Sequence, residues 1–287
     1  MAANFVIPTE MKAWVYREHG DVASVLRLDP EFEVPKVQES QVLVKVLAAA
    51  LNPVDTMREN AAVPGYDLAG IVVKAARNVK KLKVGEEVRG FTLHASNGTL
   101  AEYTAVEESL LALKPKKLSF EEAASQPAVI QIAYGGLEKA GLSPGKSLLV
   151  LGGASGVGTL AIQLGNEVFG ASRVAATSST GKLDLLKSLG AELAIDYTKV
   201  NFEDLQKRQS EQAVKAIKLG GSVVTIGEHG KTKPPPAFSF VATSDGSTLA
   251  KPVIDPKGPF PFSQAIEAFS HLQSCWAAGK VVIHPIP

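Results

Sequence analysis

The chain has little of what builds disulfide and metal sites. Cys275 is the single cysteine among 287 residues, which excludes an internal disulfide framework and a cysteine-rich metal site. The five histidines have no metal-ligand spacing, so zinc is not expected; they are His19, His94, His229, His271 and His284.

Excess charge and long apolar runs are also missing. Thirty Lys and Arg against 29 Asp and Glu give a net charge of +1, which offers no electrostatic reason to expect nucleic acid or an anionic membrane as a partner. No uninterrupted apolar run is long enough to cross a bilayer. Residues 1–11 carry no signal-peptide core, so we expect a cytoplasmic protein, or a plastid one if a presequence has been removed.

The order of patterns predicts an α/β protein with a β-rich first part. With 45% hydrophobic residues, the chain is long enough for two domains. Residues 12–16 and 41–50 alternate as strands do, and prolines punctuate them. After residue 121, helices are expected at 121–140, 157–169, 182–189 and 212–218, and strands at 147–151, 172–178, 193–196 and 222–226. This rhythm predicts a doubly wound parallel sheet. A final strand at 280–285 is expected to rejoin the first domain.

A glycine-rich turn at residues 148–162, LLVLGGASGVGTLAI, lies between a predicted strand and a predicted helix. Gly153 and Gly158 match the outer glycines of the dinucleotide fingerprint G-x-G-x-x-G, whereas Ser155 takes the middle place and Gly156 follows it. Such a turn brings backbone close to a diphosphate at a helix N-terminus. The alternative is a turn without a ligand.

The segment after the next predicted strand favours NADP over NAD. An NAD site places a carboxylate there for the ribose 2′-hydroxyl. This chain has SSTGK at residues 178–182, and its first acid is Asp184. Hydroxyls and one lysine suit a 2′-phosphate. The alternative is a helix N-cap at Ser179 or Thr180, and both roles are compatible.

Several segments in order resemble one enzyme family: LNPVD, VPGYDLAGIVV, VGEEVRG, GTLAEYTAV, GGASGVG and AAGKVVIHPIP. They are similar to the zinc-free medium-chain dehydrogenase/reductases, and within them to the plant quinone oxidoreductase-like enzymes that reduce enones and 2-alkenals. The resemblance implies a GroES-like β-rich substrate domain (1–122 and 255–287), a Rossmann domain (123–254) and NADPH. It also implies hydride transfer to the β-carbon of a small α,β-unsaturated carbonyl compound.

The resemblance assigns cofactor contacts one position at a time. It places Gly156 and Val157 at the diphosphate, Tyr197 near the adenosine half and the backbone of Ile226 along the cofactor. The residues implied at the 2′-phosphate are Ser179, Thr180, Gly181 and Lys182. Tyr197 and Ile226 have simpler readings as residues that pack at strand ends.

The nicotinamide and substrate pocket is expected to include Asn52, Met57, Tyr66 and Ile132. Relatives usually have lysine at Met57 and often threonine at Ile132, so two apolar side chains replace polar ones, and Gly181 replaces a common lysine. Without the lysine, the enolate oxygen would receive hydrogen bonds from backbone N–H groups, the Asn52 amide, the Tyr66 hydroxyl or the cofactor ribose.

Other functions stay open at this point. One is a quinone reductase of the same fold. Others are an NADPH-binding relative without turnover, in a structural or RNA-binding role, and a non-redox cyclisation role. We expect no nucleic acid, membrane or metal partner, and a monomer or homodimer. The segment NFEDLQKRQSEQ has no apolar strand where relatives have one, so the chain is expected to be shorter there.

Overall fold

The computed structural model describes residues 5–18, 20–56, 63–92, 98–199, 222, 224 and 250–287. The chain divides into two compact units. Unit 1 comprises Met1–Ala128, Ser244–Ser247 and Pro252–Pro287, and unit 2 comprises Val129–Thr243 and Thr248–Lys251. A division by compactness does not define functional domains, so the boundaries after residues 122 and 254 stay a prediction. None of the described helices is long and apolar enough to cross a membrane.

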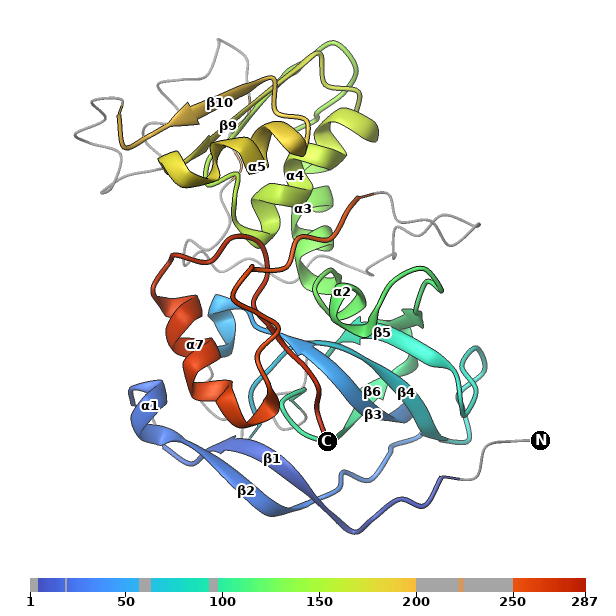
Figure 1. Cartoon of the computed structure of the whole chain (residues 1–287). Helices are drawn as coiled ribbons and strands as arrows, with labels where there is room; N and C mark the ends of the chain where they lie inside the picture. The colour runs from blue at the N-terminus through green and yellow to red at the C-terminus, as the bar shows by residue number, and fades with distance from the viewer. Residues whose placement is uncertain are drawn as a thin grey trace. The chain divides into compact units, whose positions relative to one another are not determined.

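Unit 1 is built from antiparallel strands (Figure 1). The larger sheet has the order β11-β3-β4-β5-β7, and β6 also pairs with β3. Its strands are β3 (Gln41–Ala50), β4 (Asp67–Ala75), β5 (Glu87–Phe91), β6 (Tyr103–Glu107), β7 (Leu111–Leu113) and β11 (Val282–Ile283). A separate pair joins β1 (Glu10–Tyr16) to β2 (Leu26–Glu33), with the short helix α1 (Val22–Val25) between them in sequence.

The central strand β3 has the bounds predicted for residues 41–50. Its last residues are small, and Ala48 and Ala50 are fully buried against Ala123 and Ala124 of α2 (Phe120–Ala124). Small side chains allow a helix to approach a sheet closely. Ser119 caps α2 with a full capping box, which fixes where the helix begins.

The prediction of one helix over residues 121–140 is wrong. The structure has α2 and then a second helix, α3 (Pro127–Lys139). Pro127 has no N–H to donate to the preceding turn, so it ends one helix and opens another. Asp67, from β4, accepts a hydrogen bond from the N–H of Ala128 at 2.8 Å and so fixes the start of α3.

The end of the chain returns to unit 1, as expected. β11 pairs antiparallel with β3, with Val282 opposite Ala50. The strand is shorter than the predicted 280–285, and Pro285 cannot donate to a ladder. The helix α7 (Ala265–Gln273) contributes Phe269 to the same core as β3, β4 and β11.

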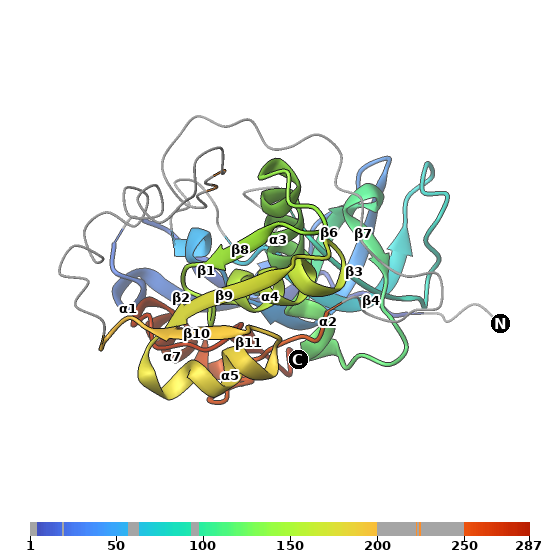
Figure 2. The same ribbon diagram turned by 90° about the horizontal axis from the view of Figure 1, so that it is seen from above.

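Unit 2 has a parallel sheet of order β10-β9-β8. Its strands are β8 (Ser147–Val150), β9 (Arg173–Ser178) and β10 (Leu193–Asp196), connected by α4 (Gly156–Glu167) and α5 (Leu183–Ser188). Both crossovers run in one direction, so right-handed connections place α4 and α5 on one face of the sheet (Figure 1 and Figure 2). The helix predicted at 212–218 lies outside the described residues, as does most of the strand predicted at 222–226.

Candidate active site

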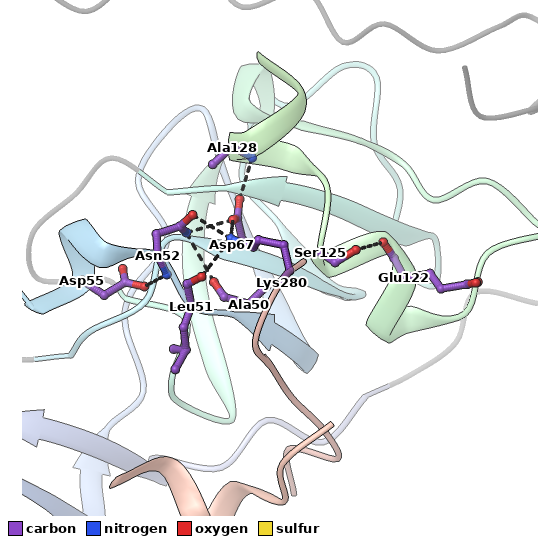
Figure 3. Close-up of polar contacts among 9 residues, drawn as sticks. All are labelled: Ala50, Leu51, Asn52, Asp55, Asp67, Glu122, Ser125, Ala128 and Lys280. Carbon is purple, nitrogen blue, oxygen red and sulfur yellow. Dashed lines mark hydrogen bonds and ion pairs between the residues drawn. The ribbon is translucent and has the colours of Figure 1, made fainter. Parts of the chain in front are cut away.

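A buried lysine holds together the segment that follows β3 (Figure 3). Lys280 precedes β11, and its side chain is 5% exposed. Its Nζ donates to Leu51 O at 2.9 Å, Asn52 Oδ1 at 2.6 Å and Asp67 Oδ2 at 3.0 Å. An ammonium group has three donors, and here each has an acceptor. We call Asn52, Asp67 and Lys280 the Lys280 cluster.

The Lys280 cluster fixes the orientation of the Asn52 amide. Lys280 can only donate, so the amide oxygen faces it, and the amide nitrogen donates to Asp67 Oδ2 at 2.9 Å and more weakly to Ala50 O at 3.4 Å. The backbone N–H of Asn52 donates to Asp55 Oδ2 at 2.7 Å. An enolate oxygen would therefore have to displace Asp67 or Ala50 to receive a hydrogen bond from the Asn52 side chain.

The other predicted pocket residues are placed separately. Tyr66 is half-buried directly before β4, and its carbonyl accepts from Thr92 N at 2.9 Å. Gly65 precedes it with φ of +96°, and an added Cβ would lie 2.3 Å from Thr99 Oγ1, so only glycine fits. Ile132 belongs to α3 in unit 2 and is 41% exposed. Met57 lies outside the described residues.

The glycine turn of unit 2 is closely packed and ends in a capped helix. Ser155 caps α4, and its Oγ accepts from Gly158 N at 3.0 Å. A Cβ at Gly158 would lie 2.3 Å from Gly152 O, and one at Gly153 would lie 2.8 Å from the Cβ of Ala176. Side chains at these two positions would push the turn away from β9 and α4.

The start of α4 presents N–H groups beside this turn. The first N–H groups of a helix have no acceptor within the helix. Ser155 Oγ accepts a hydrogen bond from the N–H of Gly158. The N–H groups of Gly156 and Val157 belong to the first two residues of the helix. The N–H of Gly153 donates to Thr177 O at 2.8 Å, which ties the turn to β9. Together with the glycines, this arrangement fits the diphosphate of a dinucleotide.

The segment predicted to hold the 2′-phosphate follows β9 as a short 3₁₀ turn, η3 (Thr180–Lys182), with Ser179 before it. Ser179 occupies the N-cap position of η3 but its side chain makes no capping hydrogen bond, and the Thr180 hydroxyl donates to Asp196, so neither side chain caps the helix as the alternative expected. A Cβ at Gly181 would meet no atom within 4 Å, so a longer side chain fits there. Tyr197 directly follows β10, is 43% exposed and donates its N–H to Ser178 O at 3.2 Å.

Two residues that contact predicted site residues were missed from the sequence. Asp196 ends β10 and accepts a hydrogen bond from Thr180 Oγ1 at 2.6 Å. Lys280 reaches Asp67 across 213 positions of sequence. Asp196 could have been found from its position at the end of a predicted strand, because β9 and β10 are parallel neighbours and their last residues meet at one edge of the sheet. No local signal identified Lys280. Ile226 lies outside the described residues.

Metal ligands do not gather in the described part of the chain, where no group of three or more His, Cys, Asp or Glu could hold an ion.

Comparison with known proteins gives the family. Residues 38–116 match the model of the alcohol dehydrogenase GroES-like domain. The chain is 55% identical to 2-methylene-furan-3-one reductase of Solanum lycopersicum, over 98% of this chain and 81% of that protein. The chain belongs to the quinone oxidoreductase-like medium-chain dehydrogenase/reductases. The predicted family and its fold, a GroES-like domain with an α/β parallel-sheet domain, are thereby confirmed.

Two more members of this family are similar over nearly the whole chain. NADPH-dependent alkenal/one oxidoreductase, chloroplastic, of Arabidopsis thaliana is 50% identical over 100% of this chain and 83% of that protein. The quinone oxidoreductase of Thermus thermophilus, solved also in complex with NADPH, has a TM-score of 0.74 at 26% identity and covers 96% of this chain and 100% of that one. The match to the tomato reductase spans 318 residues, more than the 287 of this chain, so that relative has residues that this chain lacks.

Proposed function

We propose that this protein is an NADPH-dependent reductase of the C=C bond of α,β-unsaturated carbonyl compounds, that is, enones and 2-alkenals. The observation that carries the proposal is identity of 55% and 50%, over nearly the whole chain, to relatives named for reduction of a methylene-furanone and of alkenals and enones. The glycine turn, which has no room for a Cβ at Gly153 or Gly158, and the capped start of α4 support the proposal of a dinucleotide site.

Specific residues of this chain would hold NADPH. Gly156 and Val157 present N–H groups to the diphosphate, and Ser179 and Lys182 bind the 2′-phosphate. Tyr197 contacts the adenosine half. When bound, NADPH supplies the hydride.

The protein orients the unsaturated carbonyl and stabilises negative charge on its oxygen. No nucleophile or metal is needed for conjugate reduction. The Asn52 amide nitrogen donates to Asp67, and its oxygen accepts from Lys280. Because the amide is engaged in these bonds rather than directed to the substrate, we assign Asn52 a positioning role. Donors to the oxygen are then the Tyr66 hydroxyl, backbone N–H groups or ribose hydroxyls.

The test is loss of NADPH absorbance with a panel of enones, 2-alkenals and quinones. We expect turnover with the enones and 2-alkenals. Turnover with quinones alone would assign a quinone reductase, and tight NADPH binding without turnover on any of these would assign a cofactor-binding relative. Activity should survive a chelator.

Lys182→Ala tests the cofactor assignment. A charge-assisted contact to phosphate contributes about 1.5–3 kcal/mol, so the variant should bind NADPH at least about tenfold more weakly and NADH nearly as before. Lys187→Ala is the matched control, because Lys187 lies on α5, which directly follows Lys182, and pairs with Asp184 at 3.6 Å. Equal weakening of both cofactors would make Lys182 structural.

We propose a cytoplasmic location, with the plastid as the alternative that the chloroplastic Arabidopsis relative supports. A fluorescent fusion of the full-length gene product in leaf cells distinguishes the two. Sedimentation distinguishes a monomer from a homodimer.

A further inference from the structure

A carboxylate lies beside the segment proposed to bind the 2′-phosphate. Asp196 is the last residue of β10 and pairs in register with Ser178, the last residue of β9. Its Oδ2 accepts a hydrogen bond from Thr180 Oγ1 at 2.6 Å. Thr180 stands between Ser179 and Lys182 in sequence, so the acid and the proposed phosphate ligands share one edge of the sheet.

The carboxylate is charged and engages the hydroxyls around it. Oδ1 of Asp196 accepts from Thr198 Oγ1 at 2.6 Å and from Thr198 N at 3.0 Å, and Lys199 Nζ lies 3.8 Å from Oδ2. Hydrogen bonds from Thr180 and then Thr198 hold the pKa of Asp196 below its usual value. Asp196 is therefore ionised at neutral pH.

These bonds decide what Thr180 can offer a ligand. A carboxylate only accepts hydrogen bonds, so the Thr180 hydroxyl uses its single proton to donate a hydrogen bond to Asp196. The Thr198 hydroxyl lies 3.1 Å from Thr180 Oγ1 and also donates its proton to Asp196. The Thr180 oxygen thus presents lone pairs.

A 2′-phosphate and a 2′-hydroxyl respond differently to this surface. A phosphate monoester carries about −1.5 to −2 charges at neutral pH and has only acceptors to offer. It is repelled by Asp196 and gains nothing from Thr180. A ribose 2′-hydroxyl has a proton to donate, and both Thr180 and Asp196 can receive it. Gly181 adds no side chain that would compensate.

We propose that Asp196, directly and through Thr180, is a specificity-determining residue that reduces the preference for NADPH over NADH. Lys182 and Ser179 attract the 2′-phosphate and Asp196 opposes them, so NADH competes better than a cationic site alone would allow. This inference rests on the proposed function, namely binding of a nicotinamide cofactor at this edge.

The test compares Asp196→Asn with Glu192→Gln. Both variants remove one negative charge, but Glu192 precedes β10 at its opposite end and pairs with Arg173 at 3.2 Å. Dissociation constants for NADPH and NADH are measured by fluorescence titration of each cofactor. Asp196→Asn should raise the ratio of NADPH to NADH affinity by about three- to tenfold, as expected for removal of a charge within several ångströms of a partly solvated anion. Glu192→Gln should leave the ratio within about twofold of the parent, because its charge lies at the far end of the strand.

The outcomes separate the two proposals. Failure of the parent to bind either cofactor overturns the proposed function. An NADPH-binding parent whose ratio is unchanged in Asp196→Asn overturns the role of Asp196 and leaves the proposed function standing. Asp196→Ser, also uncharged and smaller, repeats the measurement if the first variant does not fold, as judged by thermal melting, and must shift the ratio in the same direction.

Discussion

Replacement of Lys280 by methionine should strongly destabilise unit 1. Asp67 is fully buried, and Lys280 is the cation that lies 3.0 Å from its Oδ2. In Lys280→Met the carboxylate keeps hydrogen bonds from Asn52 and Ala128 but loses its counter-charge. A buried charge without its partner is costly, because the low-dielectric interior cannot replace the solvation that the ion lost.

The expected loss is about 3–5 kcal/mol in the free energy of unfolding, the range for removal of one partner of a buried ion pair. For a unit of this size, the loss corresponds to a fall of roughly 6–20 °C in melting temperature. Urea unfolding followed by circular dichroism measures the free energy, and the fluorescence of Trp14, in the unit 1 core, reports the transition there. Lys36→Met is the matched control, because the Lys36 side chain is 91% exposed, and it should change stability little.

The double variant Asp67→Asn/Lys280→Met decides whether charge is the cause. A neutral amide at position 67 can still accept from Ala128, so the double variant should regain much of the stability lost in Lys280→Met. A loss below about 1 kcal/mol in Lys280→Met, or no recovery in the double variant, would refute the argument from a buried unpaired carboxylate.

Four further variants test separate features. Arg89→Met should lower the free energy of unfolding by about 1–3 kcal/mol, measured in urea, because the buried Gln126 Oε1 loses its hydrogen bond from Arg89 Nη1; an unchanged or higher midpoint would contradict this. Glu108 loses some solvation by burial, yet the N–H groups of Leu82, Lys80 and Lys81 bring its pKa below 4.5, so it stabilises the fold above pH 4.5 and less as pH falls further. Glu108→Gln should therefore flatten the dependence of melting temperature on pH below 4.5, and an unchanged slope would count against it. Gly158→Ala should weaken binding of NADPH and NADH alike in titrations, because a Cβ would lie 2.3 Å from Gly152 O; normal binding would show that the turn adapts. Met57→Lys should raise turnover on small enones by about tenfold, since a preorganised donor to an oxyanion contributes a few kcal/mol, and a folded variant without gain would mean that the pocket serves another substrate.

Local patterns predicted elements well where burial alone determines them. The bounds of β3 agree with prediction because its buried apolar residues continue to the last position, Ala50. The helix over 121–140 was wrong because apolar periodicity continues through Pro127, whereas hydrogen bonding does not.

The candidate site also has a part that the sequence predicts and a part that it does not. The glycine turn was recognisable because its geometry depends on neighbours in sequence. The Lys280 cluster was not, since its members come from segments far apart in sequence that only the fold brings together. Asn52 was predicted as a pocket residue, but whether its amide can donate depends on Asp67 and Lys280, which no pattern near Asn52 reveals.

The discontinuity of unit 1 has a consequence for the order of folding during synthesis. Strands β8, β9 and β10 leave the ribosome within about fifty residues of one another, so their pairing needs only short loop closures. The edge of β3 and the charge of Asp67 must wait for β11 and Lys280, because Lys280 follows Asp67 by 213 residues. Until then the nascent chain exposes an unpaired strand edge and an uncompensated acid, the kind of surface on which chaperones act.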